Sequence, residues 1–296
     1  MKKAFILLHL AVVLAGFTGV FGRLITLNAG LISWYRLMLS GLLLLLILAA
    51  SGRLKKITFK NAVRIGSAGA FLGLHWVFFY ASIKYSNISV GVVCFSLTSF
   101  FTSILAPLLN RKKFSLAELI LSGLTLCGIG LIFGLDAHYR TGIILGVISS
   151  LLVAFYTIFN ERLTKVFANE TITLYTMFGG FAGVTLFLPV YLYLFPVKMA
   201  LPSLPDFGYL LILALFCTVL LYLMSTYALK TISAFTVNLT FGLEPLYSII
   251  LAILIFKENR DLTVGFYCGL GLIILSVVLQ MVRVAGHRRK RTISAD

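Results

Sequence analysis

Four ionisable residues lie inside long apolar runs, and they are His9, Arg36, His75 and Glu244. A charge at the centre of a bilayer costs roughly 2.5–3.5 kcal/mol on insertion scales, so such groups usually face protein or water. Arg36 could bind a substrate carboxylate or phosphate, or pair inside the protein. Glu244 could take up a proton or meet a substrate amine, or hold a helix interface as a protonated carboxyl. His9 and His75 could titrate near neutral pH, or pack through hydrogen bonds.

Seven further polar side chains fall near the middle of their apolar runs. They are Tyr80, Ser96, Thr98, Tyr156, Asn160, Tyr222 and Asn238. Together with Arg36 and Glu244, they predict an aromatic and polar substrate-binding pocket suited to amino-acid-like metabolites. Glu244 and, second to it, His9 are the candidates for proton coupling. The alternative for any one of these residues is a hydrogen bond between helices.

Enzyme motifs are missing from the sequence. It has no His-Glu-x-x-His, no Gly-x-Ser-x-Gly, no Walker loop, and no His or Cys pair with metal-ligand spacing. The four cysteines lie singly in apolar runs, which favours packing over disulfides or redox chemistry. We therefore predict a non-enzyme without catalytic residues, metal or cofactor.

The composition indicates that lipid is the solvent around these residues. Of the 296 residues, 60% are hydrophobic and 11% are charged, whereas soluble domains are about 25% charged. A spanning helix needs roughly 20 apolar residues. Ten segments qualify, which predicts an all-α integral membrane protein. The spans are 4–22, 30–50, 64–83, 88–109, 116–135, 142–160, 172–195, 207–228, 234–256 and 262–283.

The basic residues set the predicted orientation. The gaps between spans lie alternately on the two sides of the membrane. The side that holds both termini has 18 Lys and Arg residues, the other side has 6, and Arg36 lies inside a span. Cytoplasmic loops carry such an excess, so both termini are predicted to be cytoplasmic in an inner (plasma) membrane. Residues 284–296 form a basic cytoplasmic tail suited to anionic headgroups. The net charge is +16, but the basic residues that produce it cluster between the spans. We therefore do not expect the protein to bind nucleic acid.

An internal repeat relates the two halves of the chain. Residues 15–24 match 154–163, and Phe95-Ser96-Leu97-Thr98-Ser99 matches Phe241-Gly242-Leu243-Glu244-Pro245. Each half, 4–135 and 142–283, then holds five helices, and an odd number inverts the second half. Inverted repeats are typical of secondary transporters that bind substrate near the midplane and work by alternating access.

Several short motifs resemble the drug/metabolite transporter superfamily, in particular its EamA-type members. They are Trp34-Tyr35-Arg36, Tyr227-Ala228-Leu229-Lys230, Leu243-Glu244-Pro245-Leu246-Tyr247 and Phe256-Lys257-Glu258-Asn259. The first half departs from the pattern with Ser99 in place of Pro and Lys112 in place of Glu. The resemblance implies ten helices in two five-helix repeats and secondary export of amino acids or related metabolites.

Other functions remain as alternatives to a carrier. An intramembrane enzyme acting on a lipid would need convergent catalytic groups near one membrane face, and a channel or facilitator would show no counterflow. The partners expected are a small-molecule substrate and the bilayer. The Gly-x-x-x-Gly pairs at Gly69, Gly179 and Gly265 favour packing within the bundle over a dimer face, so both a monomer and a homodimer stay open.

Overall fold

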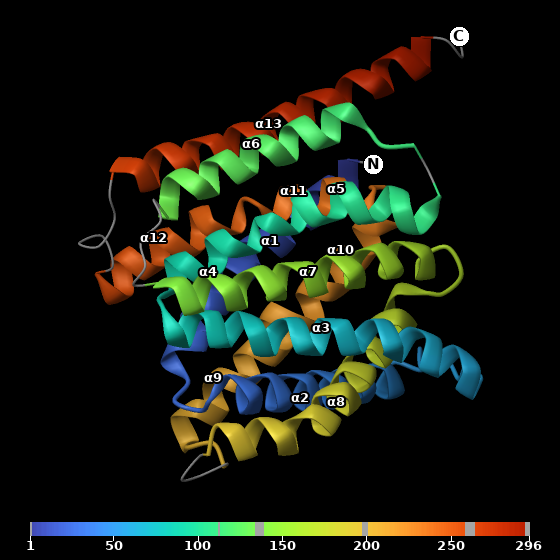
Figure 1. Ribbon diagram of the computed structural model, residues 1–296. Coiled ribbons are helices and arrows are strands. Elements are labelled where there is room, and N and C mark those ends of the chain that lie inside the picture. The colour runs from blue at the N-terminus through green and yellow to red at the C-terminus, as the bar shows by residue number, and fades with distance from the viewer. Residues whose placement is uncertain (1, 112, 134–138, 197–200, 258–263, 294–296) are drawn as a thin grey trace.

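The computed structural model describes residues 2–111, 113–133, 139–196, 201–257 and 264–293, and it is a bundle of helices lying side by side along roughly one direction (Figure 1). The helices in chain order are α1 (Lys2–Leu24), α2 (Ala29–Ala50), α3 (Phe59–Tyr85), α4 (Ile88–Phe95), α5 (Leu97–Asn110), α6 (Leu116–Phe133), α7 (Arg140–Leu163), α8 (Asn169–Leu194), α9 (Leu204–Ala214), the π-helical η2 (Leu215–Leu220), α10 (Leu221–Leu229), α11 (Ala234–Phe241), α12 (Glu244–Phe256) and α13 (Val264–Ile293).

These helices make the ten membrane spans that the sequence predicts. Nine continuous helices or helix series within the described ranges are long and apolar enough to cross a membrane, and a shorter apolar helix, Leu116–Ile132, supplies the tenth. Three spans are interrupted: α4 continues into α5, α9 into η2 and α10, and α11 into α12. Lys112, one of the two departures from the family pattern, lies outside the described residues.

Polar caps in the short loops fix where several helices begin. Asn28 accepts a hydrogen bond from the Leu31 N–H, and Asn87 accepts one from the Val90 N–H. Each bond satisfies one of the four amide donors that a helix leaves unpaired at its start. The loops therefore sit at the ends of the spans.

The packing of the helices follows an approximate twofold symmetry between the two halves. The first span, α1, packs against α10 and α12, and its equivalent in the second half, α7, packs against α3 and α5. Likewise α2 contacts α9, while its equivalent α8 contacts α3. The equivalent pairs α2 with α8 and α6 with α13 meet each other directly. This pattern confirms two inverted five-helix repeats.

Glycines bring α3 and α8 into backbone contact. A Cβ atom at Gly69 would lie 2.9 Å from the Gly180 nitrogen, and one at Gly73 would lie 2.8 Å from the Gly180 carbonyl oxygen. Small residues allow such approach in membrane bundles. These Gly-x-x-x-Gly pairs thus pack within the bundle, and so does Gly269, which meets Gly128.

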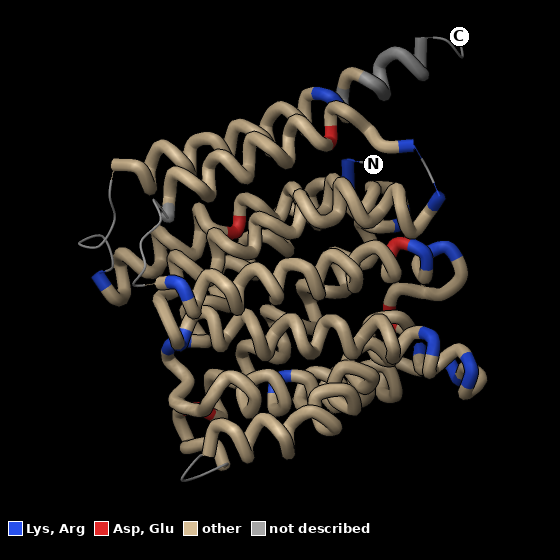
Figure 2. The backbone as a smooth tube through the Cα atoms, in the orientation of Figure 1, with Lys and Arg blue, Asp and Glu red and all other residues tan. Residues whose placement is uncertain are grey.

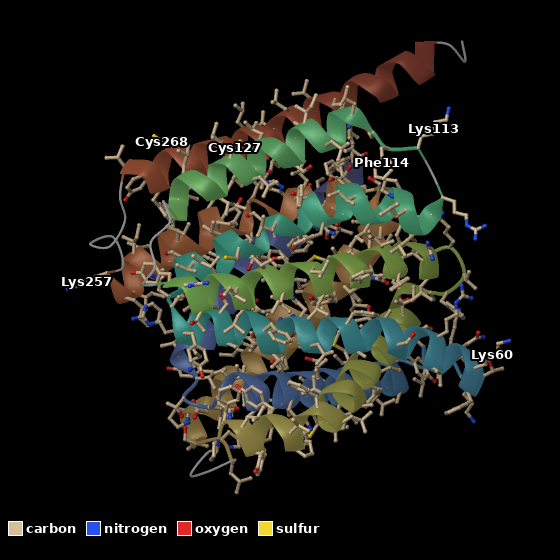
Figure 3. All side chains as sticks on the ribbon, in the orientation of Figure 1. Lys60, Lys113, Phe114, Cys127, Lys257 and Cys268 are labelled. Carbon is tan, nitrogen blue, oxygen red and sulfur yellow. The ribbon has the colours of Figure 1, made fainter. Side chains whose placement is uncertain are left out.

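The last spans of the two halves form a pair at one edge of the bundle. Figure 1 shows α6 and α13 side by side there. Thr125 and Ser276 join them by a hydrogen bond of 2.9 Å between their hydroxyls. Cys127 and Cys268 are exposed on these two helices (Figure 3).

Lys and Arg residues gather toward one end of the bundle, where α3 begins and α7 ends (Figure 2). Lys60 lies at this end, and Lys257 lies at the opposite one (Figure 3). We call the end that holds Lys60 the basic end. The backbone of the predicted tail continues α13 as far as Ile293.

Candidate functional site

A small buried cavity lies among α1, α2, α3, α4, α10, α11 and α12. Its volume is about 40 Å³. The residues that line it are Ala15, Thr18, Arg36, His75, Trp76, Phe79, Phe95, Leu221, Tyr222, Phe241 and Glu244. Both halves of the chain thus contribute, and the wall is aromatic with one cationic and one acidic side chain.

Arg36 holds a fixed position in this wall although it is only 1% exposed. Its Nε donates to the Thr218 hydroxyl at 2.7 Å and its Nη1 to the Tyr80 hydroxyl at 2.8 Å. The guanidinium carbon lies 3.8 Å from the centre of the Trp76 ring, a cation–π contact. All these partners are neutral, so the positive charge is oriented by the protein without being cancelled.

The π-helical segment η2 explains the third partner of Arg36. The Leu221 N–H at the end of η2 bonds to the Phe216 carbonyl, five residues back. When pairing returns to the four-residue spacing of α10, one carbonyl is left out of the ladder. The Cys217 carbonyl accepts from the Arg36 Nη2 at 2.6 Å. Arg36 therefore satisfies a backbone group that the π-helix frees.

Glu244 stands at the break in the ninth span. It is the first residue of α12, where Pro245 also sits, directly after the interruption at Gly242 and Leu243. The residue is 4% exposed, yet its carboxyl group has no hydrogen-bond partner within the described part of the chain. Nor does it form an ion pair with Arg36, although the two line one cavity. The start of a helix favours a carboxylate, so the group is placed to act on a cavity occupant.

The fourth span breaks at the matching position of the repeat. Phe95 ends α4 and Phe241 ends α11, and their ring centres are 6.3 Å apart in an edge-to-face contact. In the first half Ser99 replaces the expected proline, and its hydroxyl donates to the Ser96 carbonyl at 3.1 Å. The helix is interrupted there without a proline, so this departure leaves the shared architecture intact.

Three of the nine predicted substrate-binding residues line the cavity, namely Arg36, Tyr222 and Glu244. Tyr80 does not line the cavity, but its hydroxyl accepts a hydrogen bond from Arg36, which does. Tyr222 connects the cavity to a second polar group, because its ring lies 5.9 Å from that of Tyr156. Asn160 there donates to the Tyr156 hydroxyl at 3.0 Å.

The other predicted residues are placed beside the cavity or away from it. Asn238 donates to Thr102 at 2.7 Å and so ties α11 to α5, and Thr98 donates to the Phe95 carbonyl at 2.6 Å. The Ser96 hydroxyl is buried without a partner among the described residues. His9 lies on the exposed face of α1.

The sequence singled out His75 but did not assign it to the pocket; it lines the cavity, and its Nδ1 is held by the Ser149 hydroxyl at 2.7 Å. Sequence reasoning missed Trp76, which lines the cavity, and Thr218, which accepts from Arg36. An aromatic or a hydroxyl side chain in an apolar run most often packs, so neither gave a separate signal. The repeat match did contain Phe95 and Phe241, and their paired position at the two breaks was the usable clue.

Known proteins resemble this chain in sequence and in fold. The model of the EamA-like transporter family matches it twice, over residues 2–134 and 140–282. An uncharacterized transporter of Haemophilus influenzae is 30% identical over 164 residues, or 52% of this chain and 53% of that protein. The match thus spans about half the length of this curated relative. One crystal structure of another protein, 14% identical, superposes with a TM-score of 0.70 over 93% of this chain and 96% of that chain.

Proposed function

Because this chain belongs to the EamA-like transporter family, we propose that it is a secondary transporter for small zwitterionic metabolites, amino acids or related compounds, and that it works by alternating access. The observation that carries the proposal is the arrangement of Arg36 and Glu244, which line one cavity without pairing with each other. The substrate carboxylate binds the Arg36 guanidinium, and the substrate ammonium binds the Glu244 carboxylate.

The surroundings of these two groups support a zwitterion over a plain anion or cation. A substrate with one charge would leave the other buried group without a partner, and an unpaired buried charge is strongly unfavourable. The aromatic side chains of Trp76, Phe95 and Phe241 line the rest of the cavity. They offer apolar contact to a substrate side chain.

The size of the cavity supports a mechanism in which the halves move. At about 40 Å³, the cavity is far smaller than the roughly 300–1,000 Å³ of typical small-molecule sites. Binding therefore requires the walls to separate. The walls come from both inverted repeats, so rocking of one against the other opens the cavity to each side in turn.

Glu244 is the group to which we assign proton coupling. It faces the cavity, whereas His9 lies on the exposed face of α1. Protonation of Glu244 and binding of the substrate ammonium would compete for the same carboxylate, which links the two. We place the basic end and both termini in the cytoplasm of a cell with an inner membrane, and the proposed direction is export.

Competition for transport in proteoliposomes tests the substrate assignment. Uptake of a radiolabelled amino acid is measured against an excess of the same compound, of its decarboxylated amine and of its deaminated acid. We expect the amino acid to compete at least tenfold better than either analogue. Equal competition by the amine alone would contradict the role of Arg36, and equal competition by the acid alone that of Glu244.

Glu244→Gln tests the coupling assignment, with Glu170→Gln, at the start of α8, as the matched control. Because the Glu244 carboxylate is also proposed to bind the substrate ammonium, the pH profile of the residual uptake is compared and not its rate. The Glu244 variant should lose the pH dependence of uptake, and the Glu170 variant should keep it. An unchanged pH profile in the Glu244 variant would refute the assignment of coupling.

A further inference from the structure

A second and larger pocket lies at the basic end, on the seam between α3 and α7. Its volume is about 270 Å³. Arg64 and Ser67 of α3 line it together with Phe159 and Arg162 of α7. These residues are near the start of α3 and near the end of α7, so the pocket lies close to one membrane surface.

The pocket faces the surroundings of the bundle and not the central cavity. Ser67 and Val63 of α3 are exposed, whereas Leu72 and Trp76 on the opposite face of the helix are buried in the core. A ligand could therefore enter sideways from the bilayer without passing through the transport site.

The charge of the pocket is positive and unbalanced. Arg64 is exposed, and its side chain makes no hydrogen bond or ion pair to any part of the chain that the structure describes. Arg162 donates from Nε to Asn110 at 2.8 Å and from Nη2 to the Leu109 carbonyl. Since a guanidinium has five N–H donors, three remain. No acidic residue lines the pocket.

The inner wall of the pocket is apolar and aromatic. The Phe71 ring stacks on Phe155 with centres 5.5 Å apart and lies 5.8 Å from Phe159. The Arg162 guanidinium carbon lies 5.8 Å from the Phe159 ring centre. The pocket therefore has cationic donors near the membrane surface and an apolar wall at greater depth. This order matches a phospholipid, whose anionic headgroup lies at the surface and whose acyl chains lie deeper.

We propose that this pocket binds an anionic phospholipid of the leaflet at the basic end, with its phosphate between Arg64 and Arg162 and its acyl chain along Phe71 and Phe159. Basic pockets between spans on the cytoplasmic side can bind anionic headgroups, and each Lys or Arg near the surface contributes about 1 kcal/mol to such attraction. Loss of Arg64 should therefore weaken binding about fivefold.

Native mass spectrometry of the full-length protein in detergent tests the site. The protein is titrated with phosphatidylglycerol or with phosphatidylcholine of the same acyl chains, and the lipid-bound fraction is measured. Arg64→Gln removes the free charge, and Lys60→Gln removes a charge of the same end outside the pocket. Ser67→Trp fills the pocket while the charge stays the same. Both Arg64 and Ser67 are exposed, so these variants should fold.

The expected result is tighter binding of phosphatidylglycerol, which is weakened about fivefold in Arg64→Gln, weakened also in Ser67→Trp because the pocket is filled, and affected least in Lys60→Gln. Equal losses in Arg64→Gln and Lys60→Gln would mean unspecific attraction to charge and would overturn the proposal. So would equal binding of the two lipids. Displacement of the bound lipid by millimolar inorganic phosphate would overturn the lipid assignment in favour of a free anion.

Discussion

The contact between α3 and α8 leaves no room for a methyl group at Gly69, and Gly69→Ala should therefore destabilise the protein. The new Cβ would lie 2.9 Å from the Gly180 nitrogen and 2.9 Å from the Thr176 carbonyl carbon, and closer still to the Thr176 carbonyl oxygen. These are backbone atoms of a helix and cannot rotate away. The two helices must move apart and lose contact along their length.

Overpacking of this kind costs about 1–3 kcal/mol, which corresponds to a fall in Tm of roughly 2–12 °C for a protein of this size class. The assay is thermal unfolding in detergent with a thiol-reactive dye. The buried thiols of Cys94 and Cys217 react only when the helix packing is lost, whereas Cys127 and Cys268 are exposed beforehand and set the baseline.

Gly123→Ala is the matched control, because a Cβ at Gly123 of α6 would have no atom within 4 Å. Alanine is also the better helix former by about 1 kcal/mol, so this variant should keep or slightly raise Tm. Equal Tm values for Gly69→Ala and Gly123→Ala would refute the account of the α3–α8 contact.

Three further predictions concern the site and its supports. Arg36→Lys should lower transport about tenfold although it keeps the charge, because one ammonium cannot reach three fixed acceptors. Two lost bonds of about 0.6 kcal/mol each weaken the site by roughly this factor; uptake at saturating and limiting substrate measures this. Asp206→Ala should lower Tm by several degrees, because the Asp206 carboxylate accepts from the Thr26 amide at 2.8 Å and from the Thr26 hydroxyl at 2.7 Å, and a typical hydrogen bond contributes about 0.5–1.5 kcal/mol. Asn238→Leu should lower Tm modestly but leave the ranking of competing substrates unchanged, since Asn238 bonds to Thr102 outside the cavity; a changed ranking would contradict this placement.

The sequence was sufficient for the architecture because the bilayer constrains it strongly. Spans must be apolar over their whole length, so their positions can be read from composition, and the span ending at Gly22 in the prediction ends at Leu24 in the structure. The repeat match paired Phe95 with Phe241, but the breaks that follow these two residues in the fourth and ninth spans were not predicted and are seen only in the structure.

The site was predictable only in part, because burial in lipid does not say toward which neighbour a side chain points. A charged side chain such as Arg36 or Glu244 must face protein or water, so its presence in an apolar run was enough to predict that it lies at an internal site. Hydroxyl and amide groups can satisfy themselves between helices, as Thr98 and Asn238 do. The π-helical turn that presents the Cys217 carbonyl has no sequence pattern of its own, so this partner of Arg36 could only be seen in the structure.

Counterflow tests the central claim most directly, because it separates a carrier with one alternating site from a channel or an enzyme. Proteoliposomes holding the purified protein are preloaded with an unlabelled amino acid, and uptake of the labelled compound is followed beside unloaded vesicles. We predict saturable uptake that preloading accelerates and that Arg36→Lys diminishes. Uptake that rises linearly with concentration and is indifferent to preloading would contradict alternating access.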